Sequence, residues 1–384
     1  MIKSFIKSLL RFFLRILWIL PVNKKKALFI SFEGSSISCS PFYISQALSK
    51  ECPNLKIVWC SNNKEHHKLL DNYKNIKFVK KNSFSYIVEN VTSKFLFSNT
   101  GFSSWVPFRI KTQILINTWH GGGAYKKIGI SIKDSKELRK SEQRNAKNIT
   151  YFISSSKAFT SVMKDSMLIE EKKFLSIGLP RNDIFFDLKK VEEERLKVYK
   201  KFNIPEDSFL ILYAPTYCRF DQGITVDIDW NLNLGLLKNA AKKRFNKNVF
   251  LAYRGHYFDK VESKVLYDAD FSTYPNMQEL LCAADMLITD YSSSMWDFSL
   301  TKKPCILFCP NMEIYKENWG FYTDPKTWGF PIAKTNDELE KLIVNFEQNE
   351  YNKAIEKNHE YFGSFENGNA TQKIVDLVKE NLCN

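Results

Sequence analysis

Polar side chains in this sequence repeatedly follow apolar runs that have the length of β-strands, and the first of these is His120. It comes after the run 113–118 and before three consecutive glycines at 121–123. Glycines let a backbone approach a ligand closely, and histidine readily accepts a proton at neutral pH. We interpret His120 as a general base and Gly121 as a supporting residue. The alternative is a histidine in an ordinary turn.

A second histidine stands in the triplet Arg254-Gly255-His256, after the apolar run 249–253. Arginine and histidine beside a glycine suit a phosphate or a developing negative charge. We expect Arg254 to bind substrate phosphates and His256 to be a second catalytic residue. The other histidines stand in polar or charged stretches and are predicted to lie at the surface: His66, His67 and His359.

The stretch 290–297 follows the apolar run 286–289 and reads Asp-Tyr-Ser-Ser-Ser-Met-Trp-Asp. Its serines fit the N-cap and first turn of a helix, where amides and hydroxyls can bind a phosphate; the alternative is capping alone. Asp297 is expected to accept hydroxyl groups of a ribose or substrate, or only to offset the helix dipole. The residues predicted to bind the phosphates and the nucleotide here are Thr289, Asp290, Ser292, Ser293 and Asp297.

Two further motifs are candidates for the site, although each could also be explained as an ordinary turn. Thr216, in Ala214-Pro215-Thr216 at the end of an apolar run, is predicted to join the phosphate site. Arg181, Asn182 and Asp183 follow Gly178-Leu179-Pro180 and are predicted to be supporting residues. There is no Walker A loop and no G-x-G-x-x-G fingerprint, and the cysteines and histidines lack zinc-ligand spacing. We predict no metal and no cofactor, and expect the scattered cysteines to be reduced and mostly buried.

The elements that must position these motifs alternate between short apolar runs and longer mixed stretches. Such alternation predicts an α/β fold with largely parallel sheets. The predicted strands are 27–32, 56–60, 76–79, 94–98, 113–118 and 151–154, and then 209–214, 249–253, 286–289 and 305–308. Helix-like stretches include 41–49 and the amphipathic 371–381.

A charged helical stretch at 189–201, followed by Asn203-Ile204-Pro205, separates the two sets of strands. We therefore expect two Rossmann-like domains, an N-terminal one over 27–200 and a C-terminal one over 205–384, with a cleft between them. Ligands in such folds bind beyond the carboxyl ends of strands, which is where the polar motifs stand.

The amino terminus carries half of the net charge of +14. Lys3, Lys7, Arg11 and Arg15 recur every four residues and would form one cationic stripe on a helix, with apolar residues covering the other face. We predict an amphipathic helix over 1–22 that lies on an anionic membrane surface. The two arginines argue against a spanning helix, and no cleavage site indicates a signal peptide.

Five blocks in this order resemble the CDP-glycerol glycerophosphotransferase family, the teichoic-acid primases and polymerases. The resemblance spans roughly residues 113–325. The matching blocks are Thr118-Trp119-His120-Gly121, Gly178 to Asp183, Leu212 to Thr216, Arg254-Gly255-His256 and Leu287 to Ser293, extended by Met295 to Phe298 and Lys303-Pro304. The family commonly has Thr-Pro where this chain has Gly122-Gly123, which affects the expected recognition of the acceptor.

The resemblance implies a GT-B fold, with the acceptor on the N-terminal domain and the nucleotide donor on the C-terminal domain. It also implies peripheral, monotopic attachment to the cytoplasmic face of the cell membrane. The implied base is His120, and the donor phosphates would be surrounded by His256, Ser292 and Ser293.

The resulting hypothesis is transfer of glycerol phosphate from CDP-glycerol, or another CDP-alcohol, to a hydroxyl of a lipid-linked or polymeric glycan, such as teichoic acid or capsule, with release of CMP. The alternatives are a ribitol-phosphate transferase that uses CDP-ribitol and a GT-B glycosyltransferase that uses a nucleotide sugar. A third is a non-enzymatic basic protein. Nucleic acid is not an expected partner, because the charge clusters at the amino terminus without aromatic platforms elsewhere.

Overall fold

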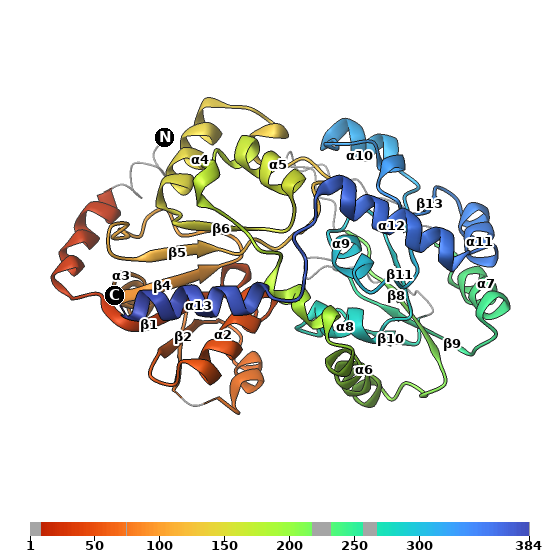
Figure 1. Ribbon diagram of the computed structural model, residues 1–384, viewed down its shortest axis with the longest axis horizontal. Helices are drawn as coiled ribbons and strands as arrows, with labels where there is room; N and C mark the ends of the chain where they lie inside the picture. The colour runs from red at the N-terminus through yellow and green to blue at the C-terminus, as the bar shows by residue number, and fades with distance from the viewer. Residues whose placement is uncertain (1–8, 74, 217–231, 256–266, 384) are drawn as a thin grey trace. The chain divides into compact units, whose positions relative to one another are not determined.

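The computed structural model describes residues 9–73, 75–216, 232–255 and 267–383, so His256 lies outside the described residues. The chain divides into two compact units, each built on its own β-sheet (Figure 1). The first unit comprises Met1–His120, Gly129–Phe186 and Phe365–Asn384, and the second comprises Gly121–Ile128 and Asp187–Ser364.

Seven parallel strands form the sheet of the first unit, in the spatial order β3-β2-β1-β4-β5-β6-β7. The chain starts in the middle and winds outward on both sides, as in doubly wound folds. Strand β5 is buried along its whole length, which explains the uninterrupted apolar runs of the sequence. The strands are β1 (Asn23–Ile30), β2 (Lys56–Cys60), β3 (Ile76–Val79), β4 (Ser93–Ser98), β5 (Ile114–Asn117), β6 (Tyr151–Ser154) and β7 (Phe174–Ser176).

Serine caps fix where several helices of this unit begin. The hydroxyls of Ser83, Ser135 and Ser156 each accept a hydrogen bond from the backbone N–H three residues later, the usual role of an N-cap. The helices are α2 (Cys39–Glu51), α3 (Phe84–Thr92), α4 (Lys136–Asn148), α5 (Lys157–Met167) and α13 (Ala370–Cys383), with 3-10 turns η1 (Arg15–Ile19), η2 (Phe32–Gly34), η3 (Glu65–Leu70), η4 (Gly129–Ser131), η5 (Glu171–Lys173) and η6 (Pro180–Phe186).

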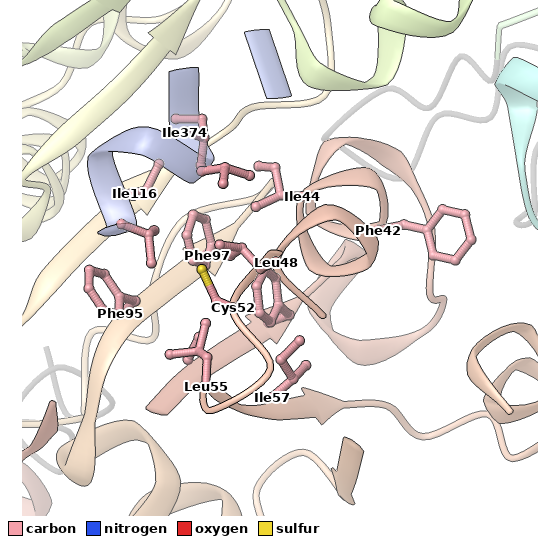
Figure 2. Packing of buried hydrophobic residues seen from close by; sticks show 14 of the residues in the cluster. Phe42, Ile44, Leu48, Cys52, Leu55, Ile57, Phe95, Phe97, Ile116 and Ile374 are labelled. Carbon is pink, nitrogen blue, oxygen red and sulfur yellow. The ribbon is translucent and has the colours of Figure 1, made fainter. Parts of the chain in front are cut away.

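The last helix of the chain completes the core of the first unit. Ile374 of α13 is buried in the same cluster as Ile44 and Leu48 of α2 and Phe97 of β4 (Figure 2). The sequence-based expectation that 205–384 forms one domain therefore differs from the structure, which assigns Phe365–Asn384 to the first unit. An amphipathic period shows that a helix has an apolar face, but it does not show which sheet that face covers.

The second unit contains six parallel strands in the order β10-β9-β8-β11-β12-β13, the same doubly wound pattern. The strands are β8 (Phe209–Tyr213), β9 (Val249–Tyr253), β10 (Ala269–Asp270), β11 (Met286–Thr289), β12 (Cys305–Phe308) and β13 (Ile332–Ala333). The helices are α6 (Leu188–Phe202), α7 (Leu234–Phe245), α8 (Met277–Ala283), α9 (Ser294–Ser299), α10 (Met312–Asn318), α11 (Asn336–Val344) and α12 (Gln348–Phe362), with the turn η7 (Pro325–Thr327).

The predicted α/β fold with two parallel sheets is confirmed. All ten predicted strands are present, with boundaries that shift by a few residues at most. Three strands were missed, β7, β10 and β13, and each is a two- or three-residue strand at the edge of its sheet. Such short edge strands leave no periodic signal in a sequence. The predicted boundary stretch 189–201 is helix α6 of the second unit.

The described part of the amino terminus leaves apolar side chains in solvent. Residues 9–14 are helical and lead into η1, where Ile16 and Ile19 are 70% and 80% exposed. Trp18 Nε1 donates a hydrogen bond to the carbonyl oxygen of Pro107 at 2.8 Å and so holds the segment to the first unit. Over the described residues, no helix combines the length and the apolar character that a membrane span requires.

Candidate functional site

His120 stands at the carboxyl end of β5 and is fixed through one ring nitrogen. Its Nδ1 lies 2.7 Å from the carbonyl oxygen of Asn99. A carbonyl oxygen only accepts hydrogen bonds, so Nδ1 must carry the hydrogen, and the lone pair of the neutral ring is then on Nε2. This is the tautomer that a general base acting through Nε2 requires.

The turn before His120 is held by local contacts. Trp119 has a positive φ of 51°, and its backbone N–H donates to Asn117 Oδ1 at 2.9 Å. The Trp119 ring stacks on the His120 ring with centroids 4.6 Å apart. A left-handed non-glycine residue is uncommon and is retained where the surroundings hold it. The turn therefore positions the imidazole between the tryptophan and Asn99.

Asn99 joins three neighbouring strand ends, and sequence reasoning missed it. It follows β4 directly and is fully buried. Its side-chain Oδ1 accepts a hydrogen bond from the backbone N–H of Phe32, just beyond β1, at 2.8 Å, while its main-chain oxygen holds His120 beyond β5. The signal that could have found it is a polar residue after the predicted strand 94–98, two positions before a glycine.

The motif Arg181-Asn182-Asp183 anchors the end of the chain to the first unit. The Asp183 carboxylate accepts hydrogen bonds from the backbone N–H groups of Ala370 at 3.1 Å and Thr371 at 2.7 Å, and so caps α13. Asn182 Nδ2 donates to Glu366 Oε1 at 3.1 Å. Asn182 and Asp183 thus hold the segment that leads into α13, whereas Arg181 Nη1 donates to Cys39 Sγ of α2 at 3.2 Å.

In the second unit the polar motifs follow three adjacent strands. Arg254 comes directly after β9, Thr216 shortly after β8 and Asp290 directly after β11, and these strands are neighbours in the sheet. The carboxyl ends of parallel strands lie at one edge. The structure therefore brings these motifs, far apart in the sequence, to one edge of the second sheet.

The carboxylate of Asp290 holds neighbouring polar residues of this edge in place. It is fully buried, and its carboxylate accepts hydrogen bonds from Thr216 N at 2.8 Å, from Thr216 Oγ1 and from Ser292 N at 3.1 Å. Burial raises the pKa of Asp290 to about 6, although the bonds from Thr216 and the charge of Lys126 act in the opposite direction. Asp290 thus positions Thr216 and the serine turn. Its burial differs from the expected direct contact with a ligand.

Ser292 and Ser293 are half-buried and lead into α9. Ser293 occupies the N-cap position but makes no side-chain capping bond. Instead, Ser292 Oγ accepts hydrogen bonds from Ser294 N at 3.3 Å and from Ser294 Oγ at 3.0 Å. The predicted capping role is therefore taken by Ser292, one position earlier than the N-cap of the helix.

Two predicted ligand-binding residues point into the protein instead. Thr289 is fully buried, and its hydroxyl donates to the carbonyl oxygen of Ala214 at 2.6 Å. Asp297 is 2% exposed, and its carboxylate accepts a hydrogen bond from Gln278 Nε2 at 3.0 Å. These contacts tie neighbouring elements together, and binding of a ligand by Thr289 and Asp297 stays a prediction.

Arg254 carries a buried nitrogen that no described residue satisfies. The side chain as a whole is partly exposed, but its Nη1 is buried without a hydrogen-bond partner in the described part of the chain. Burial lowers the pKa of Arg254 to about 10. An uncompensated buried charge is costly, and an anionic ligand at this edge would supply the missing partner.

Gly122 and Gly123, after His120, are closely packed in the second unit. A β-carbon at Gly122 would lie 2.2 Å from Cδ1 of Trp296, so no larger residue fits without rearrangement. Tyr125 follows and is buried, with its ring centroid 4.8 Å from that of Trp328. The fit against Trp296 is therefore one reason for a glycine at this position. Close approach of a ligand, the predicted reason, stays a prediction.

His359 differs from its predicted position at the surface. It is half-buried, its Nε2 lies 2.7 Å from Ser299 Oγ, and burial lowers its pKa to about 4. The charged sequence around it belongs to the exposed face of α12, whereas His359 lies on the inner face beside Trp296. Six cysteines are buried and free, as predicted for reduced thiols: Cys39, Cys52, Cys60, Cys282, Cys305 and Cys309.

Known proteins resemble this chain over most of its length. The family described as CDP-Glycerol:Poly(glycerophosphate) glycerophosphotransferase matches residues 12–380. A teichoic acid poly(glycerol phosphate) polymerase from Bacillus spizizenii is 27% identical over 94% of this chain and 94% of its own length. A teichoic acid glycerol-phosphate transferase from Staphylococcus aureus is 27% identical over 98% and 100%. The chain spans about half the length of two further polymerases of this kind.

Relatives named for ribitol phosphate match as well. Among solved structures, one of the wall teichoic acid polymerase TagF, soaked with CDPG, has a TM-score of 0.82 and 26% identity, covering 100% of this chain and 98% of that one.

Proposed function

The chain belongs to the CDP-glycerol:poly(glycerophosphate) glycerophosphotransferase family, and we propose that it transfers glycerol phosphate from CDP-glycerol to a hydroxyl of a cell-surface polymer or its lipid-linked precursor. The observation that carries this proposal is the contact between His120 Nδ1 and the carbonyl oxygen of Asn99. It supports a base in the required tautomer at the carboxyl edge of the first sheet.

In the proposed reaction, Nε2 of His120 takes the proton of the acceptor hydroxyl. The acceptor oxygen forms a bond to the glycerol-bearing phosphorus, and the bond from that phosphorus to the bridging oxygen of the diphosphate breaks. CMP leaves with the electron pair of the broken bond. Positioning and charge stabilisation supply most of the catalysis in phosphoryl transfer.

The proposal assigns the donor to the second unit. Arg254 would pair with a phosphate oxygen through Nη1, the atom that lacks a partner among the described residues. Ser292 and Ser293 would offer their hydroxyl groups to a phosphate, in a turn that Asp290 holds in place. Thr216, whose backbone N–H and hydroxyl both donate to Asp290, would line the site beside them. His256, outside the described residues, is proposed as the second catalytic residue beside the donor phosphates.

The proposal includes peripheral attachment to the cytoplasmic face of the membrane. Support comes from the exposed apolar side chains in the described segment 9–20, among them Phe12 and Phe13, which are 64% and 63% exposed. Apolar side chains beside basic residues suit the boundary between headgroups and acyl chains of an anionic leaflet.

The test is to incubate the purified full chain with CDP-glycerol, CDP-ribitol and UDP-sugars, with and without a membrane extract as acceptor, and to separate the nucleotide products. We expect CMP from CDP-glycerol, dependent on the acceptor. CMP from CDP-ribitol alone would instead favour the second candidate, which the ribitol-phosphate relatives support. UDP from a sugar donor would overturn phosphoryl transfer in favour of glycosyl transfer.

A further inference from the structure

A cavity in the first unit lies beside the turn that carries His120. It is small, with a volume of about 30 Å³, which is room for a group the size of a hydroxymethyl. Its wall is formed by the segment after β4, with Thr100 and Phe102, by the end of β5, with Asn117 and Trp119, and by the carboxyl-terminal half of α4. Trp119 stacks on the imidazole of His120, so the cavity shares a wall residue with the support of the base.

Glu142 of α4 supplies a buried carboxyl group to this cavity. The residue is 8% exposed, and its Oε2 has no hydrogen-bond partner among the described residues. Burial raises the pKa of Glu142, and the side chain of Asn145 partly opposes this effect. A buried polar atom without a partner is costly in free energy. Its position in a cavity wall therefore points to a ligand that supplies a hydrogen bond.

The other wall residues indicate which chemical class that ligand has. Phe102, Met167 and Ile169 provide apolar surface, while the amides of Asn117 and Asn145 provide polar atoms. None of the described residues that line the cavity is a lysine or an arginine, although the chain carries a net charge of +14. A phosphate would meet a carboxyl group and no cation here, which disfavours an anion.

A sugar or polyol has the complementary properties. Its C–H groups pack on apolar and aromatic side chains, and its hydroxyls pair with a few amides and carboxylates. We propose that this cavity is a subsite for a neutral, hydroxyl-bearing group of the acceptor, with Glu142 Oε2 accepting a hydrogen bond from one hydroxyl. This inference rests on the proposed function for the identity of the occupant as an acceptor.

A kinetic test compares Glu142→Gln with Glu137→Gln, which changes an exposed glutamate on the same helix. The concentration of the membrane-extract acceptor and that of CDP-glycerol are varied separately. We expect Glu142→Gln to raise the half-saturating amount of acceptor about tenfold, with the KM for CDP-glycerol unchanged and Glu137→Gln like the unsubstituted chain. A tenfold loss in kcat with an unchanged half-saturating amount of acceptor would overturn the subsite. If Glu142→Gln fails to fold, Asn145→Ala tests the same wall.

A binding test keeps this inference separate from the proposed reaction. Saturation-transfer NMR on the full chain uses methyl α-D-glucopyranoside, glycerol and inorganic phosphate as probes. Binding of the glycoside alone identifies the occupant as a sugar, and binding of glycerol identifies it as a polyol. In either case the signal must fall in Glu142→Gln and persist in Glu137→Gln and His120→Ala. No binding of either neutral probe, binding unaffected by Glu142→Gln, or Glu142-dependent binding of phosphate alone overturns the inference. Loss of CMP release with retained probe binding would defeat only the proposed reaction.

Discussion

His120 Nδ1 and the main-chain oxygen of Asn99 lie 2.7 Å apart, although the two residues stand 21 positions apart in the chain. The contact joins the ends of β4 and β5, which pair in parallel register. Because the acceptor in this contact is a backbone atom, the contact that sets the tautomer of the imidazole depends on the course of the chain at Asn99. The positioning of this base is therefore a property of the sheet edge.

Replacing His120 with Ala should lower acceptor-dependent CMP release by about 10²-fold or more, because general base catalysis typically contributes 10² to 10⁴. The far-ultraviolet circular dichroism and the melting temperature should change little, since the ring is only half-buried. His66→Ala, at a half-buried histidine in η3, is the matched control. Activity of His120→Ala within a few-fold of the control would remove the base assignment.

Asn99→Ala should destabilise the first unit by about 1–3 kcal/mol, because the partly buried N–H of Phe32 loses its acceptor. It should also lower kcat, since the main-chain oxygen that holds His120 moves with this residue. Asn99→Asp keeps an oxygen at the same place and is the comparison variant, with a smaller loss of stability expected. Urea unfolding and steady-state kinetics measure the two effects. Equal stability of Asn99→Ala and the unsubstituted chain would contradict the role of the Oδ1 contact.

Arg254→Gln should raise the KM for CDP-glycerol tenfold or more without lowering the free energy of unfolding. The reason is that Nη1 is buried without a partner in the described part of the chain, so removing the charge relieves a cost in the unliganded protein. Lys242→Gln, on the exposed surface of α7, serves as control. A large loss of stability in Arg254→Gln would instead assign the guanidinium a structural role.

Asp290 should make stability depend on pH in one direction. Burial raises its pKa from 3.8 to about 6, so the folded protein binds the proton more tightly than the unfolded chain does. Stability relative to Asp290→Asn is then greatest below about pH 4 and falls as pH rises to about 6, by about 3 kcal/mol in total. Urea unfolding of both proteins between about pH 3.5 and about pH 8, on either side of both pKa values, measures this difference. Asp207→Asn, at an exposed site, should show no such difference, and a parallel course for Asp290→Asn would contradict the raised pKa.

Serine substitutions at Phe12, Phe13 and Ile16 together should weaken binding of the full chain to vesicles that contain anionic lipid. These side chains are 64%, 63% and 70% exposed, and burying apolar surface in the interface drives such binding. Co-sedimentation at fixed lipid concentration measures the bound fraction, and hydrolysis of CDP-glycerol should persist. Phe84→Ser removes an equally exposed phenylalanine of α3 and should bind like the unsubstituted chain; equal weakening in both proteins would disprove a specific amino-terminal surface.

The sequence by itself determined the main strands and helices and the positions of the candidate functional residues. Apolar runs such as 286–289 and 305–308 became buried strands because both faces of a parallel sheet are covered. His120, Arg254 and Asp290 were located from the sequence because each follows such a run, and a residue after a parallel strand reaches the carboxyl edge in any arrangement of the strands. These are local relations, so local patterns were enough.

Only the tertiary structure decided which polar side chains face outward and which partners they find. Asp297 and Thr289 turn inward to Gln278 and Ala214, Asn99 reaches His120 through its main chain, and α13 packs on the first sheet. Glu142 was unremarked in the sequence because a glutamate in a charged helix resembles any exposed one. Its burial beside a cavity depends on how α4 lies against the ends of β4 and β5. Contacts between residues far apart in the chain follow from packing, and no local period carries that information.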